Sequence, residues 1–146
     1  MKWMSRYTSQ DLLYIAILGA LGLAVKPIIT PLIHIISAPL MIPGGSLAGG
    51  LYMMWLVLAV AIVKKPGAGF LTALTQALVM ISIGYFGNHG AVTLISYTLP
   101  GIVIDLTTIL FKRKDTIHSF VWMCTLANIS GSIVVTLMVM RLALIP

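Results

Sequence analysis

Side chains able to do acid–base or metal chemistry are few and widely spaced in this sequence. The chain has only three acids and three histidines among 146 residues. Asp11 and Asp115 fall at expected helix ends, so paired-carboxylate catalysis lacks its groups. His34, His89 and His118 do not have the short spacing of a local metal motif. No glycine-rich phosphate loop is present. We therefore expect no enzyme activity, no bound cofactor and no metal ion held by this chain.

Polar and aromatic side chains gather toward one end of the expected helices. This pattern indicates a different chemistry, the binding of a small molecule. Polar and aromatic groups that converge on an apolar cleft are typical of a ligand site. A wet surface with interfacial aromatic residues has the same composition. In a site, the rings of Trp55 and Tyr97 would stack on a planar ligand and Asn88 would orient its polar edge. The candidate ligand-binding residues are His34, Ser37, Tyr52, Trp55, Tyr85, Asn88, His89, Ser96 and Tyr97.

Membrane helices are the elements that must position these residues. Apolar residues make up 60% of the chain and charged residues only 8%, which is more apolar surface than a soluble domain of this length can bury. The net charge of +6 lies in short clusters beside apolar runs, as the positive-inside rule expects, so no nucleic-acid binding is predicted. We expect one multi-pass domain over residues 1–146, in the lipid bilayer of the cell membrane.

The first apolar run is expected to form a helix with a defined start and an early end. Thr8 and Asp11 have the spacing of a capping box, and the helix is expected to stop near Val25. Residues 27–45 contain prolines at positions 27, 31, 39 and 43. Because proline lacks an amide proton and clashes one turn back, this stretch is predicted to be a re-entrant or surface-lying lid.

Small residues recur on one face of that first helix. Ala16, Ala20 and Ala24 are spaced every fourth residue, so this face carries little side-chain bulk. Small faces let membrane helices approach closely. The alanine stripe therefore fits either packing within the subunit or docking onto a partner.

Four more apolar runs complete an all-α integral membrane bundle of five to six segments. A basic turn, Lys64-Lys65-Pro66-Gly67, separates the first two of these runs. Asp105 is the one acid well inside an apolar run, and we expect it to have a structural partner, with the cluster at 112–114 within about two helical turns. The expected helices are Leu47–Val63, Ala68–Phe86, Ala91–Phe111 and Ser119–Ile145.

The distribution of basic residues predicts the topology. With five crossings, basic residues at positions 2, 6, 64, 65, 112, 113 and 114 share the amino-terminal side, against Lys26 and Arg141 on the other. If the proline-rich stretch also crossed, the majority would move to the opposite side. The positive-inside rule therefore favours five crossings and a cytoplasmic amino terminus.

The basic turn and its flanks resemble a known family. Val63-Lys64-Lys65-Pro66-Gly67-Ala68-Gly69-Phe70-Leu71, Gly49-Gly50-Leu51-Tyr52-Met53-Met54-Trp55 and the alanine stripe are similar to the substrate-binding (S) subunits of energy-coupling factor transporters. The closest branch takes up hydroxymethylpyrimidine and thiamine precursors. The resemblance covers roughly Gln10 to Lys114. The chain departs from this branch in two ways. It has Thr72, Thr75 and Gln76 in the helix after the basic turn, where members of the branch tend to have acidic residues. It is also expected to cross the membrane five times, whereas family members normally cross six times.

This resemblance implies uptake of a vitamin, a vitamin precursor or another cofactor-sized molecule. In that family the S subunit binds its ligand from outside and docks through the alanine stripe onto a transmembrane scaffold subunit. Two ATPase subunits consume ATP and drive release inward. As alternatives, His34, His89 and the nine methionines would suit uptake of haem or another metal tetrapyrrole. A ligand-free membrane scaffold would need only the stripe.

The charge distribution generates a topological prediction. Tags at Lys65 and Lys114 should be protected from an impermeant reagent added outside intact cells, and a cysteine placed at Asn88 should react, because the basic segments stay cytoplasmic. Labelling of position 65 from outside would contradict the five-crossing topology.

Overall fold

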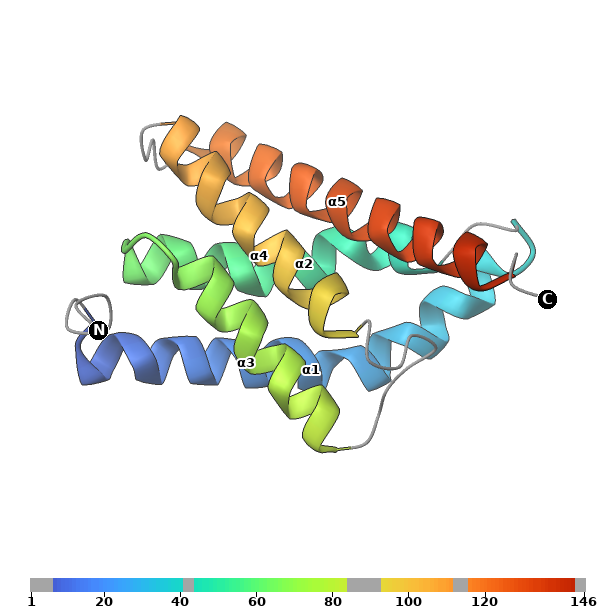
Figure 1. Ribbon diagram of the computed structural model, residues 1–146, viewed down its shortest axis with the longest axis horizontal. Helices are drawn as coiled ribbons and strands as arrows, with labels where there is room; N and C mark the ends of the chain where they lie inside the picture. Colours follow the sequence, from blue (N-terminus) through green and yellow to red (C-terminus); the bar gives the residue numbers. More distant parts are fainter. Residues whose placement is uncertain (1–6, 41–43, 84–92, 112–115, 144–146) are drawn as a thin grey trace.

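The described part of the chain is entirely α-helical. A computed structural model describes residues 7–40, 44–83, 93–111 and 116–143, and these residues contain helices and turns but no strand. This confirms the expected all-α bundle (Figure 1). The helices are α1 (Ser9–Ser37), α2 (Gly44–Val63), α3 (Ala68–Ser82), α4 (Thr93–Leu110) and α5 (Ile117–Ala143).

Helix α2 is the centre of the bundle. It packs against each of the other four helices. It also supplies four of the ten residues of the buried apolar cluster, Leu56, Val57, Val60 and Val63. The start of α1, the α2–α3 turn and the end of α4 lie at one end of the bundle, and the end of α1 lies at the other (Figure 1). Successive helices therefore run in alternating directions between the two ends (Figure 1).

Large apolar side chains cover the outside of the bundle. Ile35, Leu110 and Ile117 are 71%, 78% and 79% exposed, and other apolar residues are exposed on all five helices. A surface of this kind is stable against lipid but not against water. By length and composition, α1 and residues Ile117–Leu137 are each sufficient to cross a membrane, and Leu47–Val63, Ala68–Ser82 and Leu94–Leu110 are shorter apolar helices. The fold is a membrane helix bundle.

Helix α1 does not end near Val25, so the predicted lid is wrong over its first half. The helix has 29 residues and includes Pro27 and Pro31, and its last part rises away from the axis of the first part (Figure 1). In lipid, ending a helix leaves several backbone groups without partners, whereas each internal proline removes one hydrogen bond. Continuing as a bent helix is therefore the less costly solution. Pro39 lies in the turn that follows α1, and Pro43 lies outside the described residues.

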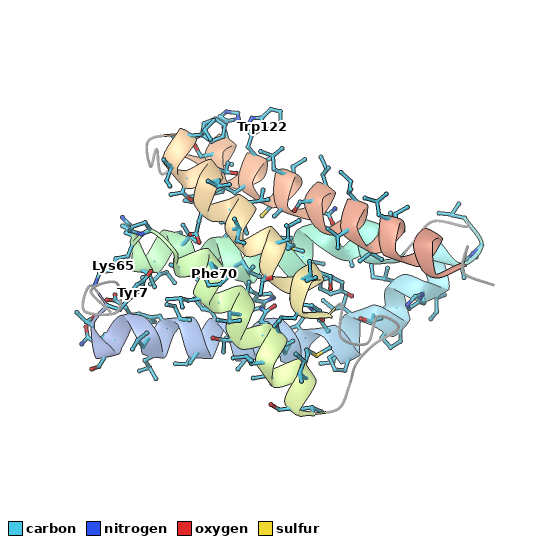
Figure 2. All side chains as sticks on the ribbon, viewed as in Figure 1. Tyr7, Lys65, Phe70 and Trp122 are labelled. Atoms are coloured by element: carbon cyan, nitrogen blue, oxygen red, sulfur yellow. The ribbon has the colours of Figure 1, made fainter. Side chains whose placement is uncertain are left out.

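The start of α1 is fastened to the basic turn. Thr8 and Asp11 form the predicted capping box, with Thr8 N donating to Asp11 Oδ2 at 2.7 Å and Asp11 N to Thr8 Oγ1 at 3.3 Å. The same carboxylate accepts a hydrogen bond from Lys65 Nζ. Tyr7 Oη donates to the Pro66 carbonyl at 2.7 Å, and Figure 2 shows Tyr7 and Lys65 side by side. Asp11 thus joins α1 to a turn more than 50 residues later.

Two left-handed residues shape this turn. Lys64, after the end of α2, has φ of 54°, and Gly67, before α3, has φ of 93°. Glycine adopts such a φ at no steric cost. The sharp reversal lets α3 return beside α2 directly, so Lys64 to Gly67 form a tight connection as the sequence predicts.

Helices α3 and α4 cross at two glycines. A Cβ atom on Gly101 would lie 2.6 Å from both the Gly69 carbonyl oxygen and Ala73 Cβ, and one on Gly69 would lie 2.9 Å from the Gly101 carbonyl oxygen. Since these neighbours include backbone, they cannot move aside easily. The close approach of α3 and α4 therefore requires glycine at both positions.

The partner of Asp105 is the start of α3. Asp105 Oδ1 accepts from Gly69 N at 3.1 Å and Oδ2 accepts from Phe70 N at 2.8 Å. These amides have no partner within their own helix, and the helix dipole favours a negative charge there. Asp105 therefore has the expected structural partner, and that partner is the pair of backbone amides at the start of α3. The basic cluster at 112–114 lies outside the described residues.

We predict that Gly101→Ala destabilises the bundle by about 1–3 kcal/mol, because overpacking at a crossing forces the helices apart. The control is Gly50→Ala, since a Cβ at Gly50 has no atom within 4 Å. Denaturation in detergent should show a clear loss for the first variant and little change for the second. Equal stability of the two variants would contradict the close crossing.

We also predict that Asp105→Asn lowers stability by about 1–2 kcal/mol, since charge-assisted hydrogen bonds to two amides become one neutral bond. Asp105→Ala should cost more. Ligand affinity should be unchanged in both variants that fold, because Asp105 lies at the turn end of the bundle. A changed dissociation constant would place Asp105 in the binding site instead.

Candidate ligand-binding site

A lysine between two tyrosines links three helices. Lys26 lies in the middle of α1, its Nζ is 3.9 Å from the centre of the Tyr97 ring on α4, and the same atom is 5.4 Å from the Tyr52 ring on α2. Each cation–π contact stabilises a cation by about 0.5–2 kcal/mol, whereas withdrawing an ammonium group from water costs several kcal/mol. The two rings thus compensate only part of the cost of this charge.

A hydrogen bond holds one of the rings. Thr30 Oγ1 and Tyr52 Oη are 2.9 Å apart. Thr30 follows Lys26 by four residues and therefore lies on the same face of α1. Lys26 and Thr30 together position Tyr52 from one side.

Two buried donors lie one turn away. Trp55 Nε1 and Gln76 Nε2 are buried and have no hydrogen-bond partner among the described residues, and Gln76 is only 2% exposed. They meet at Gly22, where an added Cβ would be 2.4 Å from Gln76 Nε2 and 3.2 Å from Trp55 Cβ. A buried donor without an acceptor costs about 1–3 kcal/mol.

The spacing along each helix joins these two groups into one site. Gly22 precedes Lys26 by four residues, and Tyr52 precedes Trp55 by three, so each pair shares a helix face. Gly22, where the two donors meet, is therefore one helical turn, ~5 Å, from Lys26 along α1. We call Lys26, Tyr52, Trp55, Gln76 and Tyr97 the central polar cluster.

The described acids lie elsewhere. Asp11 pairs with Lys65, and Asp105 accepts from the first amides of α3. The third acid, Asp115, lies outside the described residues. Among the described residues, the central polar cluster therefore contains a positive charge and no carboxylate.

Three of the nine predicted site residues, Tyr52, Trp55 and Tyr97, belong to the central polar cluster. Ser96 is buried in α4 next to Tyr97. The remaining expected residues in the connection after α3, namely Tyr85, Asn88 and His89, lie outside the described residues. Among the described residues, the structure thus groups the two tyrosines and the tryptophan of the prediction, while Tyr85 stays untested.

His34 and Ser37 lie farther along α1. They face the start of α2, where a Cβ on Gly44 would be 3.3 Å from His34 Cε1 and 3.2 Å from Ser37 Oγ. His34 is exposed and Ser37 is buried. His34 follows Lys26 by eight residues, or about 12 Å along a helix. The structure does not bring His34 and Ser37 into contact with the aromatic group.

Lys26 and Gln76 of the central polar cluster are not among the predicted site residues. The sequence places Lys26 at the end of a helix, because Pro27 follows it. A signal was nevertheless present: an isolated lysine in an apolar run is expensive in a membrane and commonly functional. Gln76 gives a similar, weaker signal inside its apolar run.

A separate groove of about 240 Å³ lies between α3 and α4, near the basic turn. Its one charged side chain, Asp105, already accepts two backbone hydrogen bonds, so the groove offers mainly apolar surface. It is lined by Pro66, Gly67, Phe70, Ile102, Asp105, Leu106 and Ile109.

The alanine stripe faces outward. Ala16, Ala20 and Ala24 are exposed, whereas Ile15 and Leu18 on the other side of α1 are buried in the bundle. The described helices leave this low-relief face of α1 open to lipid or to a partner.

Comparison with known proteins gives one family. The family described as ABC-type cobalt transport system, permease component, matches residues 10–138. The match includes α2, α3, α4 and most of α1 and α5. No curated protein and no solved structure matches the chain.

Proposed function

Because this chain belongs to the family of ABC-type cobalt transport system permease components, we propose that it is the substrate-binding membrane subunit of an energy-coupling factor importer. It is a membrane component of an ABC-type transport system, and such a system has further subunits. In this proposal the chain captures a vitamin, a vitamin precursor or another cofactor-sized molecule from outside. A separate scaffold subunit and two ATPases drive its release.

The central polar cluster is the observation that carries this proposal. It places two tyrosine rings, an indole, an amide and an ammonium group between α1, α2, α3 and α4. Apolar surroundings with a few convergent polar groups are the usual composition of a small-molecule site. Polar groups inside a membrane bundle are costly, so they commonly serve a function.

The open face of α1 supports docking onto a scaffold. Ala16, Ala20 and Ala24 are exposed along one line, and small residues allow the close backbone approach by which membrane helices associate. The alternative, in which the stripe packs inside this subunit, does not agree with that exposure.

The proposed orientation follows from charge. The α2–α3 turn, which contains Lys64 and Lys65, lies at the same end of the bundle as the start of α1 (Figure 1). Clustered lysines beside membrane helices favour the cytoplasm. The carboxyl-terminal end of α1, together with the region of Lys26, then lies toward the outside of the cell, where a ligand would enter.

Organic ligands suit the grouped side chains better than a bare metal ion does. The family description names cobalt, whereas the described part of the chain brings together aromatic rings, an ammonium group that repels a cation, and two N–H donors that cannot ligate one. Titration with cobalt(II) chloride beside organic vitamins separates the two. Tight cobalt binding that is independent of Trp55 and Tyr97 would favour the metal as substrate.

We predict that Ala20→Leu reduces both substrate uptake and co-purification with the scaffold subunit by about 5- to 150-fold, because overpacking at a close helix contact costs about 1–3 kcal/mol. The isolated variant should still bind ligand like the unmodified chain, measured by Trp55 fluorescence. The matched control is Thr125→Leu, which adds bulk at an exposed position of α5 and should assemble normally.

Two outcomes would contradict this proposal. Normal assembly of the Ala20→Leu chain would remove the stripe as the docking surface. Loss of ligand binding together with assembly would mean that the stripe supports the fold of the subunit itself.

A further inference from the structure

We propose that the ligand is an organic anion whose acidic group binds Lys26, with further acceptor atoms toward Trp55 Nε1 and Gln76 Nε2. This assignment rests on the proposed function and specifies the chemical class of its substrate. Five side chains carry it: Lys26 with its two tyrosines, and the pair of buried donors beside Gly22.

The first argument is that two buried donors of the cluster have no acceptor within hydrogen-bond distance among the described residues. The ammonium group of Lys26, the indole N–H of Trp55 and the amide N–H of Gln76 all donate. Trp55 Nε1 and Gln76 Nε2 have no acceptor among the described residues. A ligand that supplies oxygen acceptors would satisfy donors that the protein leaves without partners.

The second argument is the charge. Lys26 contacts two neutral rings, and the two described acids are both engaged at the other end of the bundle, with Lys65 and with the start of α3. A cation inside a membrane bundle is stabilised best by an opposite charge. A carboxylate or phosphate group of the ligand would provide that charge, and Tyr97 and Tyr52 would contact its adjoining ring or chain.

The third argument is geometry along the helices. Gly22, beside which the donor pair lies, precedes Lys26 by one helical turn, ~5 Å along α1. This arrangement suits a molecule whose acidic group and second acceptor lie at different points of one small skeleton.

The test uses the full-length chain in detergent with Trp55 as its only tryptophan, obtained by Trp3→Phe and Trp122→Phe. Figure 2 shows Trp122 on the outer surface of α5, and it is 53% exposed, so its replacement should be tolerated. The probe is the low-molecular-weight part of yeast extract, separated on an anion exchanger at neutral pH. Phosphatase treatment of the active fraction distinguishes a phosphate ester from a carboxylate.

We expect the fractions that the anion exchanger retains to change the Trp55 fluorescence, and the unretained fractions to leave it unchanged. Lys26→Met should weaken binding of the active fraction at least about tenfold, and Lys26→Arg, which keeps the charge, should retain most of it. Gln76→Glu places a carboxylate beside the anionic ligand, so it should weaken binding more than Gln76→Leu does. The control Lys64→Met changes an exposed lysine at the basic turn and should bind normally.

The contrary outcomes separate this inference from the proposed function. If only the fractions that the exchanger does not retain, which hold neutral or cationic molecules, change the Trp55 fluorescence, the ligand is not an anion. That result would leave the proposed function as an importer subunit unaffected. Unchanged binding by Lys26→Met, in a chain that still assembles with its scaffold, also overturns it. A chain that binds no fraction and assembles with no scaffold would overturn both.

Discussion

The contact between Asp105 and the start of α3 is the constraint on which the turn end of this bundle depends. One carboxylate accepts from the amides of Gly69 and Phe70, and these donors would otherwise be unsatisfied at a helix start in a low-dielectric environment. The crossing of Gly69 and Gly101 brings α4 close enough for this contact. One contact thus satisfies two backbone amides and gives the half-buried Asp105 carboxylate its donors, and it depends on the close packing at the two glycines.

The other acid near this end has a similar double role. Asp11 caps α1 and also pairs with Lys65, so the amino terminus and the α2–α3 turn are joined. With both described acids used in this way, the central polar cluster has a lysine without a carboxylate partner among the described residues. The scarcity of acids thus gives the central polar cluster a positive, donor-rich character.

The continuity of α1 connects fold to function. Had the helix ended before Pro27, Lys26 would lie at an interface and could reach water. Because the helix continues to Ser37, Lys26 instead lies between Tyr52 and Tyr97. The same helix exposes its alanines on the opposite side from its buried residues. Helix α1 therefore carries both proposed surfaces, one for the ligand and one for the scaffold.

The sequence by itself determined the class of protein, because composition and the length of apolar runs are local properties. The capping box of Thr8 and Asp11, the tight turn at Lys64 to Gly67 and the five helices all follow from neighbouring residues. The tertiary structure alone decided where Asp105 finds its partner, since Gly69 and Phe70 are more than 30 residues away. The tertiary structure also decided that Pro27 and Pro31 lie inside a continuous helix, because the cost of unsatisfied backbone groups in lipid outweighs the local tendency of proline to end a helix. Gln76 and Trp55 lie together because the packing of α1, α2 and α3 joins side chains that no sequence spacing connects.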